Sequence, residues 1–192
     1  MSWATFQTNM SRYMSNPDRI SSTDEVARKL AREYTRTIRT GGDTVSLASV
    51  KPVEGLIMRL KAEAMVQLFS AAFRVGASSA GAFDLVEQLG LGVTAFWSGA
   101  VLNEFPIPVL PAPGSTANIV VVANTVVNPG TWKSVIPLTP STSPDVFIQS
   151  FISAARLHLQ TVSGTIITTS LYPPVGTPAP GVLPWQGYIV PA

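Results

Sequence analysis

Proline and charge are distributed so unevenly along this chain that we expect its two halves to differ in structure. Fourteen of its 16 prolines follow residue 104, and the two exceptions are Pro17 and Pro52. The stretch 105–192 carries only three charged residues. Proline disrupts the interior of helices and of central strands. The first half instead has the charge and periodicity of amphipathic helices. The sequence therefore predicts a helical first half and a second half with extended, proline-rich straps.

Composition limits the size and class of the protein. The chain has 192 residues, 46% of them hydrophobic, so it can bury a core. Charged residues make up 12% of the chain, about half of the usual share of roughly 25%. So little charge lowers the solubility of a free monomer, which favours a surface covered by other subunits. The net charge of +2 does not by itself indicate nucleic-acid binding.

Several classes of protein are disfavoured by the sequence. It contains no cysteine, which excludes disulfides, thiolate nucleophiles and Cys-ligated metals. The first 14 residues lack the apolar core of a signal peptide, so we expect no export by that route. The charge-free stretches 105–132 and 157–192 are interrupted by proline and glycine. Neither stretch predicts a transmembrane helix, and we expect no membrane partner.

Two amphipathic helices are predicted near the N-terminus. Residues 3–14 place Trp3 and Phe6 on one face, which we expect to pack on the core or on a neighbouring subunit. Insertion of that face into a membrane interface is the alternative. A Ser-x-x-Glu capping box at 22–25 starts a second helix, 23–39.

The second predicted helix has an apolar stripe and a basic face. Apolar residues repeat at every fourth position, and four arginines line a different face: Arg28, Arg32, Arg36 and Arg39. Three interpretations remain open for this basic face. It is a solvated surface with local ion pairs, a contact with an acidic protein partner, or a contact with DNA phosphates.

A helical hairpin is predicted in the middle of the chain. Its first helix, 53–75, is apolar nearly all round in its second half, so we expect it at the centre of a bundle or at a subunit interface. A glycine- and serine-rich turn at 76–81 leads into the second helix, 83–97. The turn does not predict a phosphate loop, because no Gly-Lys-Ser/Thr follows it.

The second half predicts a strap, a small β element and one further helix. Alternating prolines make the segment near 103–118 an extended strap. The β-branched runs within 119–127 are expected to pair with 132–138 as a small sheet. A serine–proline–aspartate start predicts a helix over 143–161. The run 165–172 is typical of a strand.

These elements together predict an α+β fold that is mainly α: a helical bundle with a small β element and extended proline-rich straps. We expect a single mainly helical domain, 1–172, followed by an extended C-terminal arm, 173–192. In polyproline geometry, at about 3.1 Å per residue, the arm spans roughly 60 Å and reaches a neighbouring subunit. The predicted interface residues are Trp185, Tyr188 and Leu183 in the arm, with Trp3 and Phe6 in the first helix.

No residue pattern predicts catalysis. The one histidine, His158, has no Gly-x-Ser-x-Gly elbow to act with, and one imidazole without thiolates does not make the usual zinc set. A glycosidase needs a pair of carboxylates, which could come from Asp84, Glu87 and Glu104. The first two are better explained as the solvent-exposed side of an amphipathic helix. We expect no enzyme activity, no catalytic residue, no cofactor, no metal and no small-molecule substrate.

Three stretches of the chain carry a resemblance to a known class of protein. They are HLQTVSGTIITTSLYPPVGTPAPGVLPWQGY at 158–188, FWSGA at 96–100 and PIPVLPAPGS at 106–115. Together they resemble the small virion structural proteins of contractile-tailed bacteriophages. The resemblance implies a virion component, assembled in the host cytoplasm, that forms a homo-oligomeric ring at the neck or tail as connectors and terminators do.

The expected function is therefore that of a non-enzymatic ring subunit whose C-terminal arm binds neighbouring copies. Its expected partners are copies of itself and other virion proteins, with a passing contact with DNA left open. A capsid-decorating or other virion assembly protein is one alternative. A membrane-active or pore-associated protein is the alternative from another class, indicated by the apolar stretch 64–102.

Overall fold

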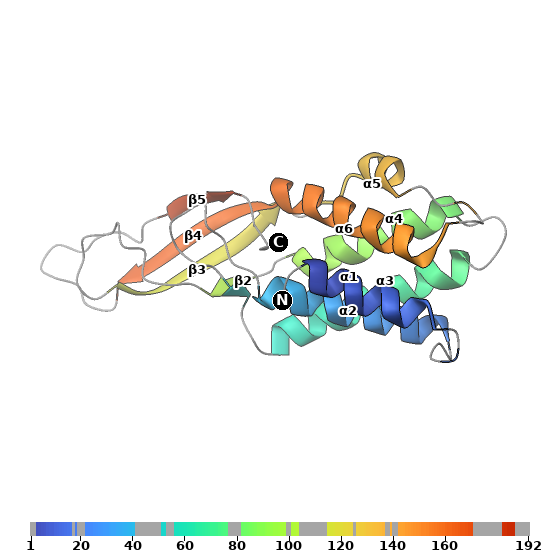
Figure 1. Ribbon diagram of the computed structural model, residues 1–192. Helices are drawn as coiled ribbons and strands as arrows, with labels where there is room; N and C mark the ends of the chain where they lie inside the picture. The colour runs from blue at the N-terminus through green and yellow to red at the C-terminus, as the bar shows by residue number, and fades with distance from the viewer. Residues whose placement is uncertain are drawn as a thin grey trace, which may run out of the picture.

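The chain forms a helical body from which paired strands extend at one end (Figure 1). The computed structural model describes residues 3–16, 18, 22–40, 51–52, 56–76, 82–98, 101–103, 115–124, 126–136, 139, 142–170 and 182–186.

The first three helices follow the apolar periodicity of the sequence. They are α1, Trp3–Met14, α2, Thr23–Thr40, and α3, Leu56–Gly76. The capping box forms at the start of α2, where the Glu25 backbone N–H donates to Ser22 Oγ at 3.2 Å. All three predicted helices are confirmed, with α3 starting slightly later than expected.

Helices α4, Ala82–Trp97, and α6, Pro144–Thr161, also lie where the sequence predicts them. The hydroxyl of Ser143 caps α6 by accepting a hydrogen bond from the Val146 backbone N–H at 3.4 Å. A proline occupies the first position of α6, where its fixed φ suits the helix and its missing N–H costs nothing.

A short helix, α5, Pro129–Val135, replaces the strand predicted over 132–138, so that prediction is wrong. Asn128 caps this helix, because its Oδ1 accepts a hydrogen bond from the Thr131 backbone N–H at 3.2 Å. The helix places Trp132 in the core, where it is 1% exposed. Burial of this large side chain outweighs the β-propensity of the segment.

Five backbone segments pair as an antiparallel sheet in the order β1-β2-β3-β4-β5 within the described residues. They are β1, Lys51–Pro52, β2, Val101–Asn103, β3, Ser115–Asn124, β4, Ser163–Ser170, and β5, Val182–Gln186. The longest pairing joins β3 to β4, with register shifts near both ends. Strand β5 lies along the other side of β4.

The α+β class expected from the sequence is wrong. Of the residues whose side chains the structure describes, 87% are helical, and these residues form six helices and contain no strand. The five strands named above consist of residues for which only the backbone is described. The expected small β element is therefore not shown by the residues whose side chains are described. The class supported by the structure is mainly helical. One physical reason is that the segment expected to complete the small sheet is drawn into α5 by Trp132.

Two predicted extended regions lie largely outside the described residues. The strap near 103–118 is described only where β2 ends and β3 begins, and the arm 173–192 only at β5. The division into a domain and an arm therefore stays a prediction.

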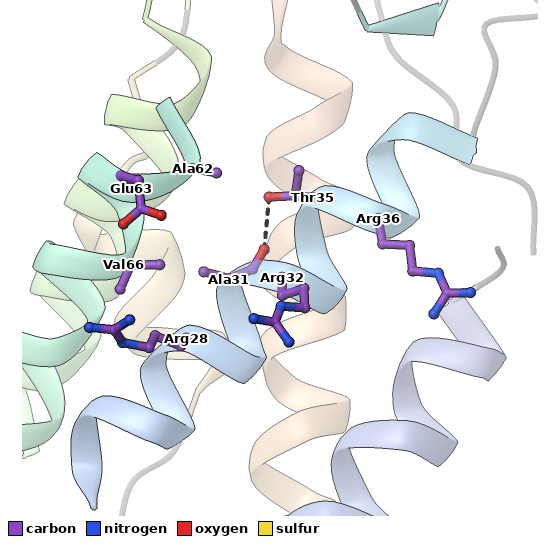
Figure 2. Close-up of a pocket in the computed structure, with 8 residues that line it drawn as sticks. All are labelled: Arg28, Ala31, Arg32, Thr35, Arg36, Ala62, Glu63 and Val66. Carbon is purple, nitrogen blue, oxygen red and sulfur yellow. Dashed lines mark hydrogen bonds between the residues drawn. The ribbon is translucent and has the colours of Figure 1, made fainter. Parts of the chain in front are cut away.

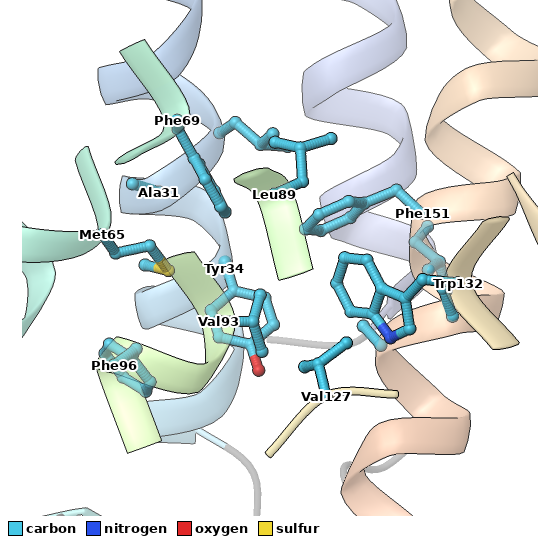
Figure 3. Close-up of a cluster of buried hydrophobic side chains, with 14 of the residues drawn as sticks. Ala31, Tyr34, Met65, Phe69, Leu89, Val93, Phe96, Val127, Trp132 and Phe151 are labelled. Carbon is cyan, nitrogen blue, oxygen red and sulfur yellow. The ribbon is translucent and has the colours of Figure 1, made fainter. Parts of the chain in front are cut away.

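Phe151 of α6 is the centre of the hydrophobic core (Figure 3). Its ring centroid lies within 6.5 Å of the centroids of Phe6, Tyr34, Phe69, Trp132 and Phe147. Apart from Phe147, these rings come from four other helices, α1, α2, α3 and α5. Each aromatic pair contributes about 0.5–1.5 kcal/mol beyond the burial of its area, so one side chain joins five helices.

A buried polar contact joins α2 to α4. The indole Nε1–H of Trp97 donates to the hydroxyl oxygen of Tyr34 at 2.8 Å, and both side chains are buried. Burial raises the pKa of Tyr34 above its ordinary value, against the smaller lowering effect of the Trp97 hydrogen bond. The phenol is therefore neutral and serves as a structural hydrogen-bonding group.

Helices α3 and α4 approach closely at Gly92. A Cβ atom built on Gly92 would lie 2.6 Å from Phe69 Cε1 and 2.7 Å from Cδ1. Phe69 is fully buried, so its ring has no free space into which it can swing. The contact between the two helices therefore requires glycine at this position.

We expect Gly92→Ala to destabilise the protein by about 1–3 kcal/mol, because overpacking outweighs the roughly 1 kcal/mol that alanine gains over glycine in a helix. Urea unfolding followed by far-UV circular dichroism measures this change. Adding Phe69→Leu to the variant should recover part of the loss, since the smaller side chain relieves the contact. A Gly92→Ala variant at least as stable as the wild type would contradict the close packing of α3 on α4.

Candidate functional site

The described surface has a polar hollow between α2 and α3, which we call the α2–α3 groove (Figure 2). Its volume is about 330 Å³. Its lining residues are Arg28, Ala31, Arg32, Thr35 and Arg36 from α2, with Ala62, Glu63 and Val66 from α3.

The two-sided sequence of α2 produces the basic wall of this groove. Leu30, Tyr34 and Ile38 are fully buried on the inner side of the helix. Residues one helical turn apart lie on one face, so Arg28 and Arg32 project together from the other side and are exposed. Three of the four predicted basic residues, Arg28, Arg32 and Arg36, thus line the groove. Arg39 lies near the end of α2, where only the backbone is described.

Two carboxylates near the basic face have other cations as partners. Asp24 accepts two hydrogen bonds from Arg74 Nη2 of α3, at 2.8 and 2.9 Å, and this contact holds the pKa of Asp24 below its ordinary value. Glu33 forms an ion pair with Lys29 at 3.0 Å and accepts a hydrogen bond from Asn9 Nδ2 at 3.0 Å. Both carboxylates therefore bind cations that do not line the groove, although Glu33 also attracts Arg36 electrostatically.

Glu33 ties α1 to α2 through its buried carboxylate. The side chain is only 3% exposed. Burial raises the pKa of this group, but the hydrogen bonds from Asn9 and Lys29 outweigh that effect, so the pKa of Glu33 lies below its ordinary value of 4.5. The ionised form is therefore the one that the folded state stabilises.

A second hollow, which we call the apolar pocket, lies against α5 and α6 and also has a volume of about 330 Å³. No charged side chain lines it; its residues are Val126, Asn128, Thr131, Trp132, Leu157, His158, Gln160 and Thr161. Val126 is 70% exposed and Leu157 is 42% exposed. The indole N–H of Trp132 is buried and has no acceptor in the described part of the chain. The pocket therefore suits an uncharged, largely apolar partner.

The structure separates the interface residues that the sequence predicts. Trp3 and Phe6 are buried in the core of their own chain, with Phe6 stacked on Phe151. Leu183 and Trp185 lie in β5, where their backbone partners in β4 are Ile166 and Gly164. Tyr188 lies outside the described residues. The basic residues are the one predicted set that the structure brings together at a groove.

Of the residues weighed for catalysis, the structure describes the side chains of His158 and Glu87, while only the backbone of Asp84 is described. His158 is 4% exposed on α6 and is one of the residues that line the apolar pocket. Glu87 is paired with Lys133 at 3.1 Å, while Glu104 lies outside the described residues. Among the described residues, no group of three or more His, Cys, Asp or Glu side chains is arranged to hold a metal ion. No described helix combines the length and apolar character needed to cross a membrane.

Sequence reasoning missed the far wall of the α2–α3 groove and the whole of the apolar pocket. Glu63 and Val66 face the arginines only because α3 packs beside α2, which no local pattern predicts. The apolar pocket had a usable signal, since Asn128 followed by proline is a helix start as well as a turn.

Comparison with known proteins gave no match to a family model, to a curated protein or to a solved structure.

The charge on Glu33 predicts that stability depends on pH. Because the pKa of Glu33 is lower in the folded than in the unfolded state, its contribution is present above pH of about 4.5 and is lost as the pH falls through the folded value. Glu33→Gln should lose about 1–3 kcal/mol at pH 7 and show a flatter decline in acid. Urea unfolding from pH 7 to pH 3 measures both effects.

Glu63→Gln is the matched control for this experiment, because Glu63 is exposed and makes no ion pair in the described part of the chain. It should keep the wild-type pH profile. If Glu33→Gln also kept that profile, the buried carboxylate would not be the group that links folding to pH.

Proposed function

We propose that this chain is a non-enzymatic structural subunit that assembles with copies of itself, as part of the neck or tail of a tailed phage. The observation that carries the proposal is the apolar pocket, whose rim exposes two aliphatic side chains, Val126 and Leu157, beside a lining without charge. Such a surface gains free energy when a protein partner covers it.

A second copy of the chain fits this pocket because it presents little charge of its own. The stretch 105–192 carries only Lys133, Asp145 and Arg156 as charged residues. Contact between two surfaces of this composition removes apolar area from water without burying unpaired charges, which is the main cost of a poor interface. A single exposed aliphatic residue would be ordinary, whereas two around one uncharged hollow favour an interface.

The C-terminal segment is the second element of the proposed assembly. Residues 173–192 contain no charge and are rich in proline and valine, with Trp185 and Tyr188 as large rigid side chains. Residues of this kind contribute disproportionately to interfaces, and proline lowers the entropy lost on binding. Part of the segment pairs with β4 as β5, so the remaining backbone edge of β5 is suited to contact with a neighbouring subunit.

The place in the virion follows from resemblance. The stretches 96–100, 106–115 and 158–188 together resemble small structural proteins of contractile-tailed phages. In such particles, small proteins form rings that join the portal to the tube and sheath. A ring subunit needs contacts on two sides, and we propose that the apolar pocket and the C-terminal segment contribute to them.

We expect Leu157→Ser to weaken self-association about tenfold, because it places a hydroxyl on the rim that a partner covers. Leu91→Ser is the matched control: Leu91 is 46% exposed, close to the 42% of Leu157, but it does not line the apolar pocket. Sedimentation velocity over a concentration series measures the self-association of both variants. Equal effects of the two substitutions would contradict the assignment of the pocket as an interface.

Deletion of residues 173–192 should reduce the oligomer to smaller species while the helical circular dichroism signal is retained, because the buried core lies within α1–α6. Size-exclusion chromatography with light scattering measures the mass. A truncated chain that assembles like the full chain would exclude the C-terminal segment from the interface.

A further inference from the structure

Two arginines of the α2–α3 groove, Arg28 and Arg32, form no ion pair with a carboxylate in the described part of the chain. Arg32 is exposed and makes no ion pair or hydrogen bond in the described part of the chain. Arg28 is also exposed, and its main acidic neighbour, Asp24, is bound by Arg74. Arg28 and Arg32 are therefore available to bind an anionic group from another molecule.

Small apolar side chains also line the groove. Ala31 of α2 faces Ala62 and Val66 of α3, so small side chains separate the basic wall from Glu63 (Figure 2). An extended peptide can lie on such a surface, with its methylene groups on the alanines and its carboxylates at the guanidinium groups. The volume of about 330 Å³ matches a few side chains of such a segment.

The arrangement of the charges disfavours nucleic acid as the occupant. Glu63 stands on the wall opposite Arg28 and would repel a continuous phosphate backbone (Figure 2). A peptide differs from nucleic acid in this respect, because an amide or a lysine beside its carboxylates can donate to Glu63.

We propose that the α2–α3 groove binds an acidic peptide segment of a partner protein, with carboxylates of that segment at Arg28 and Arg32 and a hydrogen-bond donor at Glu63. The interaction is local to α2 and α3 and does not depend on self-assembly through the apolar pocket. Glu63 limits the number of carboxylates that the groove accepts and so contributes to specificity.

Fluorescence anisotropy of a fluorescein-labelled oligoglutamate peptide at low ionic strength tests this proposal. The double variant R28Q/R32Q should bind about tenfold more weakly, equivalent to ~1.4 kcal/mol. Glu63→Gln should bind about two- to threefold more tightly, because it removes the repulsive charge from the groove. Arg156→Gln is the matched control, since Arg156 is exposed on α6 and does not line the groove.

Three results would overturn the proposal. The first is no binding of oligoglutamate at low salt, and the second is equal loss of binding in R28Q/R32Q and Arg156→Gln. The third is that oligothymidine binds more tightly than oligoglutamate and that R28Q/R32Q abolishes this binding. That result would make the groove a nucleic-acid site. Thermal melting of each variant verifies folding, and the oligomer mass of R28Q/R32Q shows separately whether assembly is intact.

Discussion

The contact of Phe151 with five other aromatic rings is the interaction on which the described helical body depends. The side chain lies on α6, far along the chain from α1 and α2, yet it stacks on Phe6 and meets Tyr34 edge to face. Helix α5 joins the same cluster through Trp132. Because one ring contacts helices from both halves of the chain, the charged first half and the proline-rich second half fold as one core. The buried bond between Tyr34 and Trp97 then fixes α2 against α4.

The polar groups of the body are arranged around this core in a way that leaves distinct surfaces for partners. Buried Glu33 is compensated by Lys29 and Asn9, and Asp24 is compensated by Arg74. In the described part of the chain, Arg28 and Arg32 of the α2–α3 groove form no ion pair with a carboxylate. The apolar pocket differs from the groove, since its lining carries no charge and its rim exposes aliphatic side chains. The charged α2–α3 groove and the uncharged apolar pocket thus lie on different helices.

Helix positions were predictable from the sequence because amphipathic periodicity and capping residues are local signals. Ser22, for example, marked the start of α2 correctly. The segment around Trp132 was not predictable in this way, because its local preference for a strand is overridden by burial against Phe151. The basic residues of the groove were predicted, but its opposite wall depends on how α3 packs beside α2. The pairing of β5 with β4 was not predicted either. It places part of the predicted arm against β4, and local sequence patterns do not reveal such a contact between separate segments.

The central claim is that this chain functions as a subunit of a closed assembly, using a surface depleted of charge. Its most direct test is native mass spectrometry of the full chain over a range of concentrations. The account predicts one discrete oligomer whose mass is a whole-number multiple of 20.4 kDa. A monomer at every concentration, or a broad series of masses without a preferred state, would contradict it.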